Sequence, residues 1–398
     1  MANDNKYIPA LRFPEFQNDV EWKYVHIGHA IKTITPPKKL PSTEYKDRGE
    51  FPIIDQSLKY IAGYSNDNTA VVYNDGASIV FGDHTCTLKL IHFPFIQGAD
   101  GIKIFKSKTD DLLTEYIYQY ILANPVISAE YKRHFSDLKE KILSYPTTTI
   151  EQQKIADCLL SLDKYIDAAK RKLDILKEHK KGLMQKLFPA KGKTLPELRF
   201  PEFQNNGEWQ TVSLGEITSV VNRRNKSNRS LPIYSINNAT GFIPQSQQFA
   251  GMDSEARGYD ISAYKIIGKH NFAYNPARIN VGSIGYSGEL KDILISSLYV
   301  CFKTTDNIDD NFLMCFFNSH IFNQAVESNV EGGIRSYLFY ENFSRIKMTI
   351  PSLYEQKRIA SCITSIENMI KKSDEKISLL EIHKKGLQQQ LFPQINKL

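Results

Sequence analysis

The sequence predicts a mixed α/β protein made of two tandem halves, each joining a globular domain to one long amphipathic helix. Three observations support this prediction. A short segment and a much longer amphipathic segment each occur twice, and the stretches between them contain short β-like runs separated by turns. A repeat of this length indicates a duplicated domain with its helix rather than the unit of a solenoid.

The short repeated segment opens each half. LRFPEFQNDVEW, residues 11–22, returns as LRFPEFQNNGEW, residues 198–209, with 10 of 12 positions identical. The halves cover about 11–189 and 198–393, and each ends in Leu-Phe-Pro. We therefore predict a first domain over 1–148, a helix over 149–189, a second domain over 190–350 and a helix over 351–398.

The long repeated segment, residues 151–189 and 355–393, has 18 of 39 positions identical. Its apolar residues alternate at spacings of four and three, which is the pattern of a coiled-coil seam. The seam residues are Ile155, Leu159, Leu162, Ile166, Leu173 and Leu176 in the first copy, and Ile359, Ile363, Ile366, Ile370, Ile377 and Leu380 in the second. A lysine and then a glycine follow in both copies (Lys180 and Gly182; Lys384 and Gly386), so the seam should loosen there.

Such a helix needs a partner, because helical stability in proteins comes mainly from burying the amphipathic face. Two matching seams in one chain make an intramolecular pair the simplest arrangement. A homodimer, or pairing with a helix of another subunit, is the alternative.

The two bodies between the repeats differ almost completely in sequence. In the first, we expect β-like runs at 51–54, 70–73, 78–81, 87–93 and 102–105, and a helix near 112–122. In the second, we expect them at 232–236, 264–267, 284–286 and 298–302, followed by a helix at 312–323. A shared frame with divergent bodies indicates two domains that contact different targets.

The composition narrows the class of protein. Hydrophobic residues make up 41% of the chain and charged residues 24%, which is ordinary for a globular protein. The formal net charge of +6 suits a nucleic-acid partner without requiring one. The N-terminus has no apolar segment, no run approaches membrane-spanning length, and the five cysteines form no C-x-x-C pair. We therefore expect a cytoplasmic protein with no metal site.

The catalytic motifs that we considered lack the context that their chemistry needs. The Gly-Lys-Thr at 192–194 resembles the end of a phosphate-binding loop, but the glycine five residues earlier is missing. Tripeptides with nuclease-like E-x-K spacing begin at positions 44, 130 and 289, and such tripeptides are common by chance. No N/D-P-P-Y/F motif of a methyltransferase is present. The missing motifs argue against an independent nuclease or methyltransferase, and we expect no cofactor in this chain.

Cations and polar residues clustered in turns are the better signal. Arg and Lys suit phosphate oxygens, and Arg and Asn suit the edges of guanine and adenine. The candidate DNA-contacting residues of the first body are Lys38, Lys39, Lys46, Arg48, Asp83, His84, Thr85, Lys132, Arg133 and His134. Those of the second body are Arg223, Arg224, Lys226, Arg229, Arg278, Asn280, Ser283, Arg335 and Tyr337. A charge run is often only a solvated face, so the argument rests on their recurrence at similar depth in both bodies.

This organisation resembles the specificity subunit of type I restriction-modification systems. The resemblance covers Leu11 to Pro393 and rests on the duplicated LRFPEF…EW segment, the P…EQ helix starts at 146–152 and 351–356, and the KKGL…LFP ends. FGDHT (81–85), GADGIK (98–103), YKRHF (131–135) and FAYNPARINVGSIG (272–285) look like motifs of target recognition domains. The second helix start departs slightly, with one residue fewer between its proline and glutamate.

The resemblance implies a non-catalytic subunit whose two target recognition domains each contact one half of a split double-stranded DNA site. It implies that the helices pair antiparallel and dock two modification subunits, which carry S-adenosylmethionine. Restriction subunits using ATP and Mg would join them. A helix of this length spans roughly 55 Å, which bounds the gap at about 16 base pairs. A coiled-coil adaptor with protein-binding variable domains is the alternative.

Overall fold

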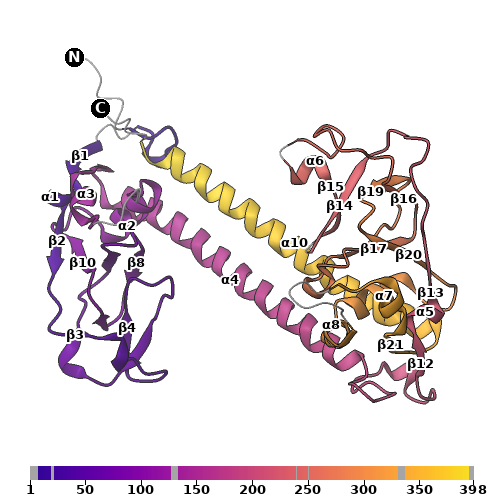
Figure 1. The fold of residues 1–398 in the computed structure, drawn as a ribbon. Helices are drawn as coiled ribbons and strands as arrows, with labels where there is room; N and C mark the ends of the chain where they lie inside the picture. Colours follow the sequence, from indigo (N-terminus) through magenta and orange to yellow (C-terminus); the bar gives the residue numbers. More distant parts are fainter. Residues whose placement is uncertain are drawn as a thin grey trace. The chain divides into compact units, whose positions relative to one another are not determined.

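The computed structural model describes residues 8–18, 22–126, 133–238, 240–249, 251–329 and 337–393 (Figure 1). The chain divides into two compact units, one of residues 1–171 with 374–398 and the other of residues 172–373. Each unit therefore contains one globular domain together with a part of both long helices. Within the described residues, no helix is long and apolar enough to cross a membrane.

The first domain is built on three groups of strands. Its strands are β1 (Trp22–His26), β2 (Ile31–Ile34), β3 (Lys39–Leu40), β4 (Phe51–Ile54), β5 (Gly63–Ser65), β6 (Val71–Val72), β7 (Ser78–Gly82), β8 (Leu88–Ile91), β9 (Phe95–Gly98), β10 (Ile102–Ser107) and β11 (Ile142–Pro146). Its short helices are α1 (Ile27–Ala30), α2 (Thr114–Ala123) and α3 (Phe135–Glu140). The strands form the pair β1-β11, a sheet ordered β2-β10-β7-β8, and a sheet ordered β3-β9-β4-β5 in which β6 also pairs with β9.

The second domain follows the same plan. Its strands are β12 (Gln210–Ser213), β13 (Thr218–Val220), β14 (Ile233–Asn237), β15 (Gly241–Pro244), β16 (Lys265–Ile267), β17 (Asn271–Tyr274), β18 (Ile284–Tyr286), β19 (Ile293–Ile295), β20 (Val300–Thr304) and β21 (Lys347–Ile350). Its helices are α5 (Leu214–Ile217), α6 (Gln245–Gln248), α7 (Asp310–Phe317), α8 (His320–Asn329) and α9 (Tyr340–Arg345). The sheets are β12-β21, β13-β20-β17-β18 and β15-β14-β19-β16.

The two domains share one topology although their sequences have diverged. The order β2-β10-β7-β8 corresponds to β13-β20-β17-β18. In the other sheet, the parallel pair of β4 and β9 corresponds to the parallel pair of β14 and β19. Antiparallel β5 and β6 flank the first pair as β15 and β16 flank the second. The duplication inferred from the repeated ends therefore extends through both sheets of each domain, while β3, which pairs with β9, has no counterpart among the described strands of the second domain.

The added residues of the second half lie mainly in two places. β5 ends at Ser65 and β6 begins at Val71, whereas 20 residues, 245–264, separate β15 from β16. The other addition is α8, and here the single helix expected over 312–323 is wrong. The chain forms α7 and α8 instead, because the Ser319 hydroxyl accepts the backbone N–H of Phe322 at 3.3 Å and starts a new helix.

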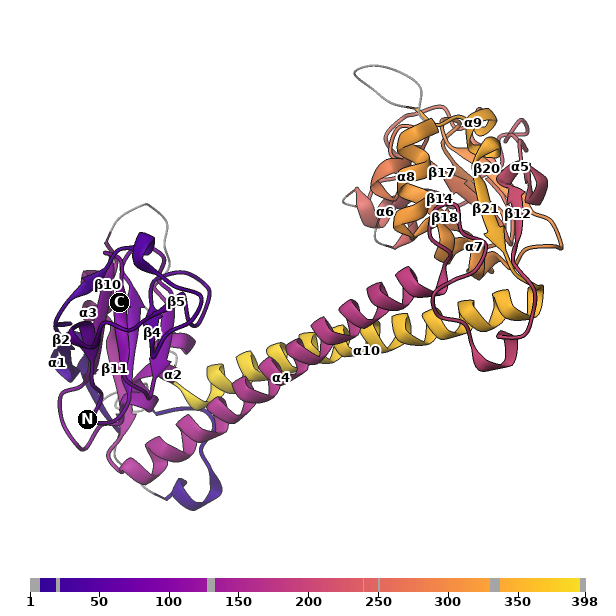
Figure 2. The same cartoon turned by 90° about the horizontal axis from the view of Figure 1, so that it is seen from below.

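The long helices are α4 (Thr149–Leu187) and α10 (Leu353–Leu391), each of 39 residues, and Figures 1 and 2 show them side by side. In the first unit the beginning of α4 lies with the end of α10, and in the second unit the end of α4 lies with the beginning of α10. The predicted antiparallel pairing within one chain is therefore confirmed.

Two equivalent ion pairs join these helices near the ends of the seam. In the first unit Lys384 of α10 bonds to Asp163 of α4. In the second, Lys180 of α4 lies 2.7 Å from Glu367 of α10. Lys180 corresponds to Lys384 in the repeat, and Asp163 to Glu367. The lysines that interrupt the seam thus each meet a carboxylate of the opposite helix, and the same contact is made twice.

The seam serves two purposes along its length. Ile166, Leu173, Ile366 and Ile377 are buried, whereas Leu162, Leu176, Ile370 and Leu380 are half-buried. Ile155 and Leu159 join the core of the first domain, and Ile359 and Ile363 join the core of the second. The start of each helix therefore packs on its own domain.

The Leu-Phe-Pro ends pack on the other domain. Phe392, at the end of α10, lies with its ring centroid 5.6 Å from that of Tyr116 and 5.3 Å from that of Tyr120, inside the core of the first domain. Phe188, at the end of α4, stacks on Phe312 at 5.3 Å inside the core of the second. Each half thus completes the core of the other half's domain.

The LRFPEF segments are held by buried ion pairs. Arg12 donates two hydrogen bonds to the Glu151 carboxylate, at 2.9 and 2.7 Å. Arg199 does the same to Glu355, at 2.8 and 2.8 Å. Both glutamates lie in the first turn of a long helix and are almost completely buried. The repeated arginine and glutamate therefore fasten the start of each domain to the start of its helix.

The glutamine after each of these glutamates orients the domain. The side-chain oxygen of Gln152 accepts the backbone N–H of Leu113, just before α2, at 2.8 Å. The side-chain oxygen of Gln356 accepts the backbone N–H of Asp309, just before α7, at 2.8 Å. The Glu-Gln pair thus contacts both the first and the later part of each domain.

Candidate nucleic-acid interface

Four loops meet at one end of the first domain's strands. We call them the first loop surface, and they cover 55–62, 83–87, 99–101 and 133–134. The backbone N–H of Asp83 donates to the Gly101 carbonyl at 2.7 Å, and that of His134 donates to the Asp83 carbonyl at 2.8 Å. The Thr85 hydroxyl donates to the Gln56 carbonyl at 3.1 Å. The motifs FGDHT and GADGIK and the described part of YKRHF, residues 133–135, which are far apart in the sequence, are therefore brought together.

The same four connections meet in the second domain. This second loop surface covers 237–238 with 240, 275–283, 296–299 and 337–339. The backbone N–H of Leu338 donates to the Pro276 carbonyl at 3.1 Å. A Cβ atom added at Gly282 would lie 3.7 Å from the Asn238 carbonyl oxygen, so these two loops touch. The Tyr299 hydroxyl accepts the backbone N–H of Ile236, just before the turn at 237–240, at 3.4 Å. The two loop surfaces are equivalent in topology and differ in their side chains.

Several predicted DNA-contacting residues are accessible on these surfaces. Those that are exposed or half-buried are His84, Thr85, Arg133, Arg278, Asn280 and Tyr337. Tyr337 stacks on the exposed Phe339 with ring centroids 5.7 Å apart. Lys132 and Arg335 lie outside the described residues. Each loop surface therefore exposes polar and cationic side chains, which suit base and phosphate contacts, and the second loop surface also exposes two stacked aromatic rings.

Three predicted contacts are corrected by their burial. Asp83 is 3% exposed, His134 0% and Ser283 1%. The Asp83 carboxylate accepts the backbone N–H of Phe135 at 2.8 Å, which ties α3 to the β7–β8 turn. These three side chains cannot reach a DNA surface in this conformation. Of the three, the Asp83 carboxylate holds the loops that carry the accessible residues of the first domain.

The basic residues of the first domain lie in the connection from β2 to β4. Lys38 bonds to Asp67 at 2.8 Å, and Lys39 bonds to Asp100 at 3.0 Å. The hydrogen bond from Lys38, together with one from Thr69, lowers the pKa of Asp67 to about 2. Lys46 and Arg48 are exposed. Half of this basic group is therefore balanced by local carboxylates.

The basic residues of the second domain lie in the equivalent connection, from β13 to β14. Arg223 and Arg229 both reach the carboxylate of Asp292, at 3.1 and 3.2 Å. Arg224 and Lys226 are exposed. Two arginines sharing one carboxylate keep a net positive charge at this edge of the domain, which suits phosphate contact.

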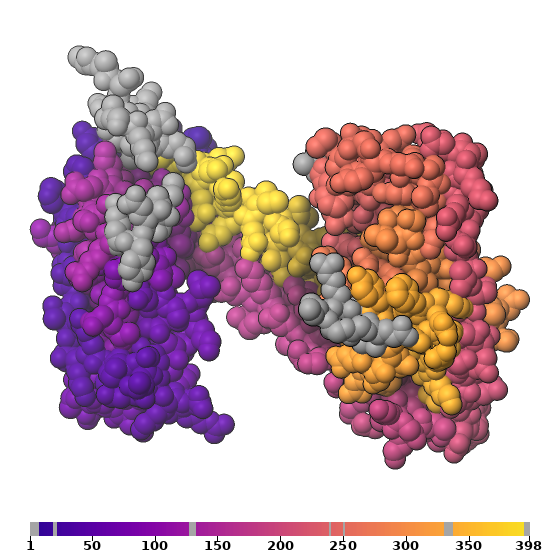
Figure 3. Space-filling model, in the orientation of Figure 1, coloured from indigo at the N-terminus to yellow at the C-terminus, as the bar shows by residue number. Residues whose placement is uncertain are grey.

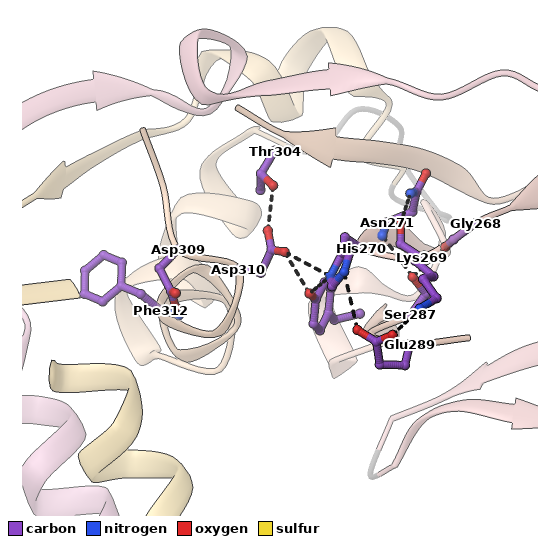
Figure 4. A network of polar contacts seen from close by, with 11 residues as sticks. Gly268, Lys269, His270, Asn271, Ser287, Glu289, Thr304, Asp309, Asp310 and Phe312 are labelled. Atoms are coloured by element: carbon purple, nitrogen blue, oxygen red, sulfur yellow. Dashed lines mark hydrogen bonds and ion pairs between the residues drawn. The ribbon is translucent and has the colours of Figure 1, made fainter. Parts of the chain in front are cut away.

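A polar network holds the opposite end of the β17–β18 hairpin (Figure 4). The Tyr286 hydroxyl donates to Asp310 at 2.8 Å and lies 2.6 Å from His270 Nδ1, while the Thr304 hydroxyl donates to Asp310 at 2.6 Å. Burial, and then the bond to Asp310, raise the pKa of Tyr286 well above its ordinary value. The network fastens the hairpin to the start of α7, and the Arg278 loop projects from the other end.

The sequence did not reveal all four loops of each surface. The loop 55–62 and the turns at 237–240 and 296–299 carry no cation cluster, so composition gave no reason to select them. The first two lie between expected strands and contain Asp, Asn or Ser, which marks them as turns, whereas 298–299 were expected within a strand that begins only at Val300. Strand pairing then decides which turns meet.

The family model of the type I restriction modification DNA specificity domain matches the chain twice, at residues 19–178 and 206–381. The chain belongs to this family. Each match runs from the start of one domain into its long helix, so the repeat of the family model coincides with the duplication read from the sequence. The chain is therefore a specificity subunit by descent, and both of its halves are specificity domains.

Curated specificity subunits match this chain over most of its length or over a part of it. The type I restriction enzyme MjaVIII specificity subunit of Methanocaldococcus jannaschii is 23% identical over 431 aligned positions, covering 96% of this chain and 93% of the relative. The EcoR124I/EcoR124II specificity subunit of Escherichia coli is 26% identical over 156 positions, covering 37% and 38%. The crystal structure of an S subunit from M. genitalium has a TM-score of 0.65 at 15% identity, covering 98% and 100%. That structure supports the fold.

Proposed function

We propose that this specificity subunit reads DNA for a type I restriction-modification complex and does no chemistry itself. Each domain contacts one half of a split site in double-stranded DNA through its loop surface. The observation that carries this proposal is the contrast between the domains: the same strands present the same four connections, yet the accessible side chains differ. A duplicated frame with two different surfaces suits the reading of two different half-sites.

The accessible residues supply the chemistry for both kinds of DNA contact. Arg278 and Asn280, exposed on the β17–β18 loop, suit the edges of guanine and adenine. Arg224 and Lys226, exposed in the connection from β13 to β14, suit phosphates, which position a protein without specifying sequence. The second domain therefore holds base-reading and phosphate-binding groups on separate connections.

The paired helices set the length of the unread gap. In the first unit Lys170 of α4 lies 2.6 Å from Glu381 of α10, which identifies the two facing stretches. Deleting Ile166–Lys172 together with the facing residues 375–381 removes one heptad from each helix and leaves the Lys384–Asp163 and Lys180–Glu367 pairs in place. The helices shorten by about 10 Å, so the gap should shorten by about three base pairs. Methylation at an unchanged gap would contradict this role.

Two modification subunits dock on the two units, one on each. The support is a set of apolar side chains whose exposure is repeated in both units. They lie on α4 and α10, parts of which are open to view in magenta and yellow in Figure 3. Ile150 and its equivalent Tyr354 are both 72% exposed, while Leu379 and its equivalent Ile175 are 67% and 68% exposed. Apolar side chains that are exposed at equivalent positions in both units suit the binding of two copies of one partner. S-adenosylmethionine belongs to those modification subunits, and ATP with Mg²⁺ to the restriction subunits.

The docking proposal is tested by stoichiometry. Ile150→Asp with Leu379→Asp should remove one modification subunit from the complex, and Tyr354→Asp with Ile175→Asp should remove the other, as measured by native mass spectrometry. Lys164→Asp, an exposed charge change on α4, serves as the control. A full complex with both double variants would refute this assignment.

The reading role is tested by mapping methylated adenines in cellular DNA. Cells carrying this chain with its modification subunit are compared with cells lacking only this chain. A new two-part motif with a fixed gap is expected. Copurification of the subunits without a new motif would refute the reading role, and failure to copurify would refute the docking role.

A further inference from the structure

The loop between β4 and β5 packs against residues 85–89, which lead into β8. Side chains of alternate residues in an extended chain point to the same side, and Thr87 and Lys89, where the chain enters β8, are such residues. The hydroxyls of Thr87 and of Thr85, in the turn before it, both donate to the Gln56 carbonyl, each at 3.1 Å. Thr85, Thr87 and Lys89 therefore all face the loop.

The third of these residues is a buried lysine. The Lys89 side chain is 7% exposed, and its ammonium donates to the Asp55 carbonyl at 2.8 Å and to the carbonyl of Lys59. The Asp55 carboxylate lies 3.8 Å away. Burying an ammonium is costly unless it is paired, and burial lowers the pKa of Lys89 while Asp55 opposes that shift. Both ends of the loop 55–59 are thus fixed by one internal cation.

The tip of this fixed loop presents an apolar side chain to solvent. The Asp55 carboxylate accepts the backbone N–H and the hydroxyl of Ser57, at 2.9 and 2.6 Å, which closes the turn before Leu58. Leu58 is 94% exposed. The Tyr60 hydroxyl donates to the Leu90 carbonyl at 2.5 Å and closes the other side. The loop therefore holds Leu58 away from the core of the domain.

The equivalent connection of the second domain needs no such support. There β14 and β15 are joined by a short turn, with Asn237 paired with Gly241 and Gly241 at a φ of 70°. Of these two equivalent connections, only the one in the first domain has the longer loop and the buried lysine. An internal charge used to fix an exposed loop indicates that the shape of the loop has a use.

We propose that the loop Asp55–Tyr60 reads DNA, with Leu58 contacting the 5-methyl group of a thymine in the major groove and Lys89 positioning the loop. This inference rests on the proposed function and identifies one reading element within it. The loop belongs to the first loop surface through its bonds to Thr85. Leucine offers only apolar contact, and the thymine methyl group is the apolar feature that distinguishes bases in that groove.

The test uses the full complex and duplexes that carry its mapped motif. Each thymine of the motif is replaced in turn by uracil, which removes only the methyl group, and binding is measured by fluorescence anisotropy. One replacement should weaken wild-type binding roughly fourfold, the value of one buried methyl-sized group. The same replacement should have no effect on Leu58→Ala, because that variant has already lost the contact. Leu298→Ala, which changes a 78% exposed leucine on the second loop surface, is the matched control.

A double-mutant cycle tests the role of Lys89. Lys89→Met removes the charge while keeping a long apolar side chain. It should abolish the same uracil effect and leave binding to the other half-site unchanged. Combined with Leu58→Ala, it should cause no further loss of binding at that base pair. If Lys89→Met only reduced the stability of the protein, it would instead lower the melting temperature and weaken binding to both half-sites.

The outcomes separate the two proposals. Uracil effects that are identical in wild type and Leu58→Ala, or a motif without any sensitive thymine, would overturn the loop assignment while leaving the reading role intact. A wild-type complex that binds no bipartite motif would overturn the proposed function itself.

Discussion

The buried Arg12–Glu151 pair allows a quantitative test of how each domain is fastened to its helix. The side chain of Arg12 is 9% exposed and that of Glu151 is 1% exposed. Replacing Arg12 with Ala leaves the Glu151 carboxylate buried beside the space that the guanidinium occupied. Breaking a buried pair by removing one partner costs about 3–5 kcal/mol, so Arg12→Ala should lower the stability of the first unit by about that amount.

Replacing both partners should cost much less. Two apolar residues of similar size need no solvation, and such replacements are commonly neutral or stabilising. Arg12→Met combined with Glu151→Leu is therefore expected to recover most of the stability that Arg12→Ala loses. The exposed neighbouring pair of Lys154 and Glu15, 48% and 44% exposed, provides the control, because Lys154→Ala should cost less than about 1 kcal/mol.

The chain supplies its own probes for this measurement. It contains two tryptophans, Trp22 in the first domain and Trp209 in the second. Urea unfolding of variants made in a Trp209→Phe background is followed by the fluorescence of Trp22, so that the first unit is observed alone. A loss below about 1 kcal/mol for Arg12→Ala, equal to that of Lys154→Ala, would refute the view that the buried pair fastens the segment.

Three further predictions follow from other contacts. Asp163→Lys should destabilise the helix pair by roughly 1 kcal/mol, and adding Lys384→Asp should restore it in urea unfolding; no rescue would show that the Lys384–Asp163 contact is dispensable. Arg278→Ala should relax specificity at one position of one half-site, at a cost of about 1–3 kcal/mol there; loss of binding to both half-sites would contradict it. Burial raises the pKa of Cys301 and of Cys315 to about 12, so both thiols should resist iodoacetamide at pH 8 until the chain unfolds. Their contribution to stability should be complete below the ordinary thiol pKa of 9.0 and fall as the pH rises toward 12; labelling as fast in the native state as in urea would refute this.

The helices could be predicted from the sequence because their signal is local. Ile155, Leu159 and Ile166 recur at helical spacing, so the burial of the seam follows from neighbours a few positions apart. The partner of Arg12 could not be found in the same way, because Glu151 lies 139 positions away. Local periodicity carries no information about such a contact, although the recurrence of both residues in the second half is consistent with it.

The loops show more clearly what local sequence patterns cannot predict. The stretch around Asp83 has the composition of an exposed turn. Strand pairing and α3 nevertheless enclose Asp83, and its carboxylate accepts the backbone N–H of Phe135 instead of facing solvent. The shared topology of the two domains was likewise hidden, because strand order depends on pairings between distant segments whose side chains have diverged. Arg278 and Asn280, which are exposed, could be selected as candidates because their side-chain types fit base edges wherever the loop lies.

The exchange of Leu-Phe-Pro ends between the halves has a consequence for the order in which the protein is completed during its synthesis. The core of the second domain uses residues from Leu183 to Ile363, which are all present before the chain is finished. The core of the first domain includes Leu391 and Phe392. Domains commonly fold in the order in which they are translated, but here the domain that is translated earlier of the two receives Leu391 and Phe392 only after the whole core of the later domain has been made. The later domain can therefore complete its core first, and the end of α10 then completes the core of the earlier one.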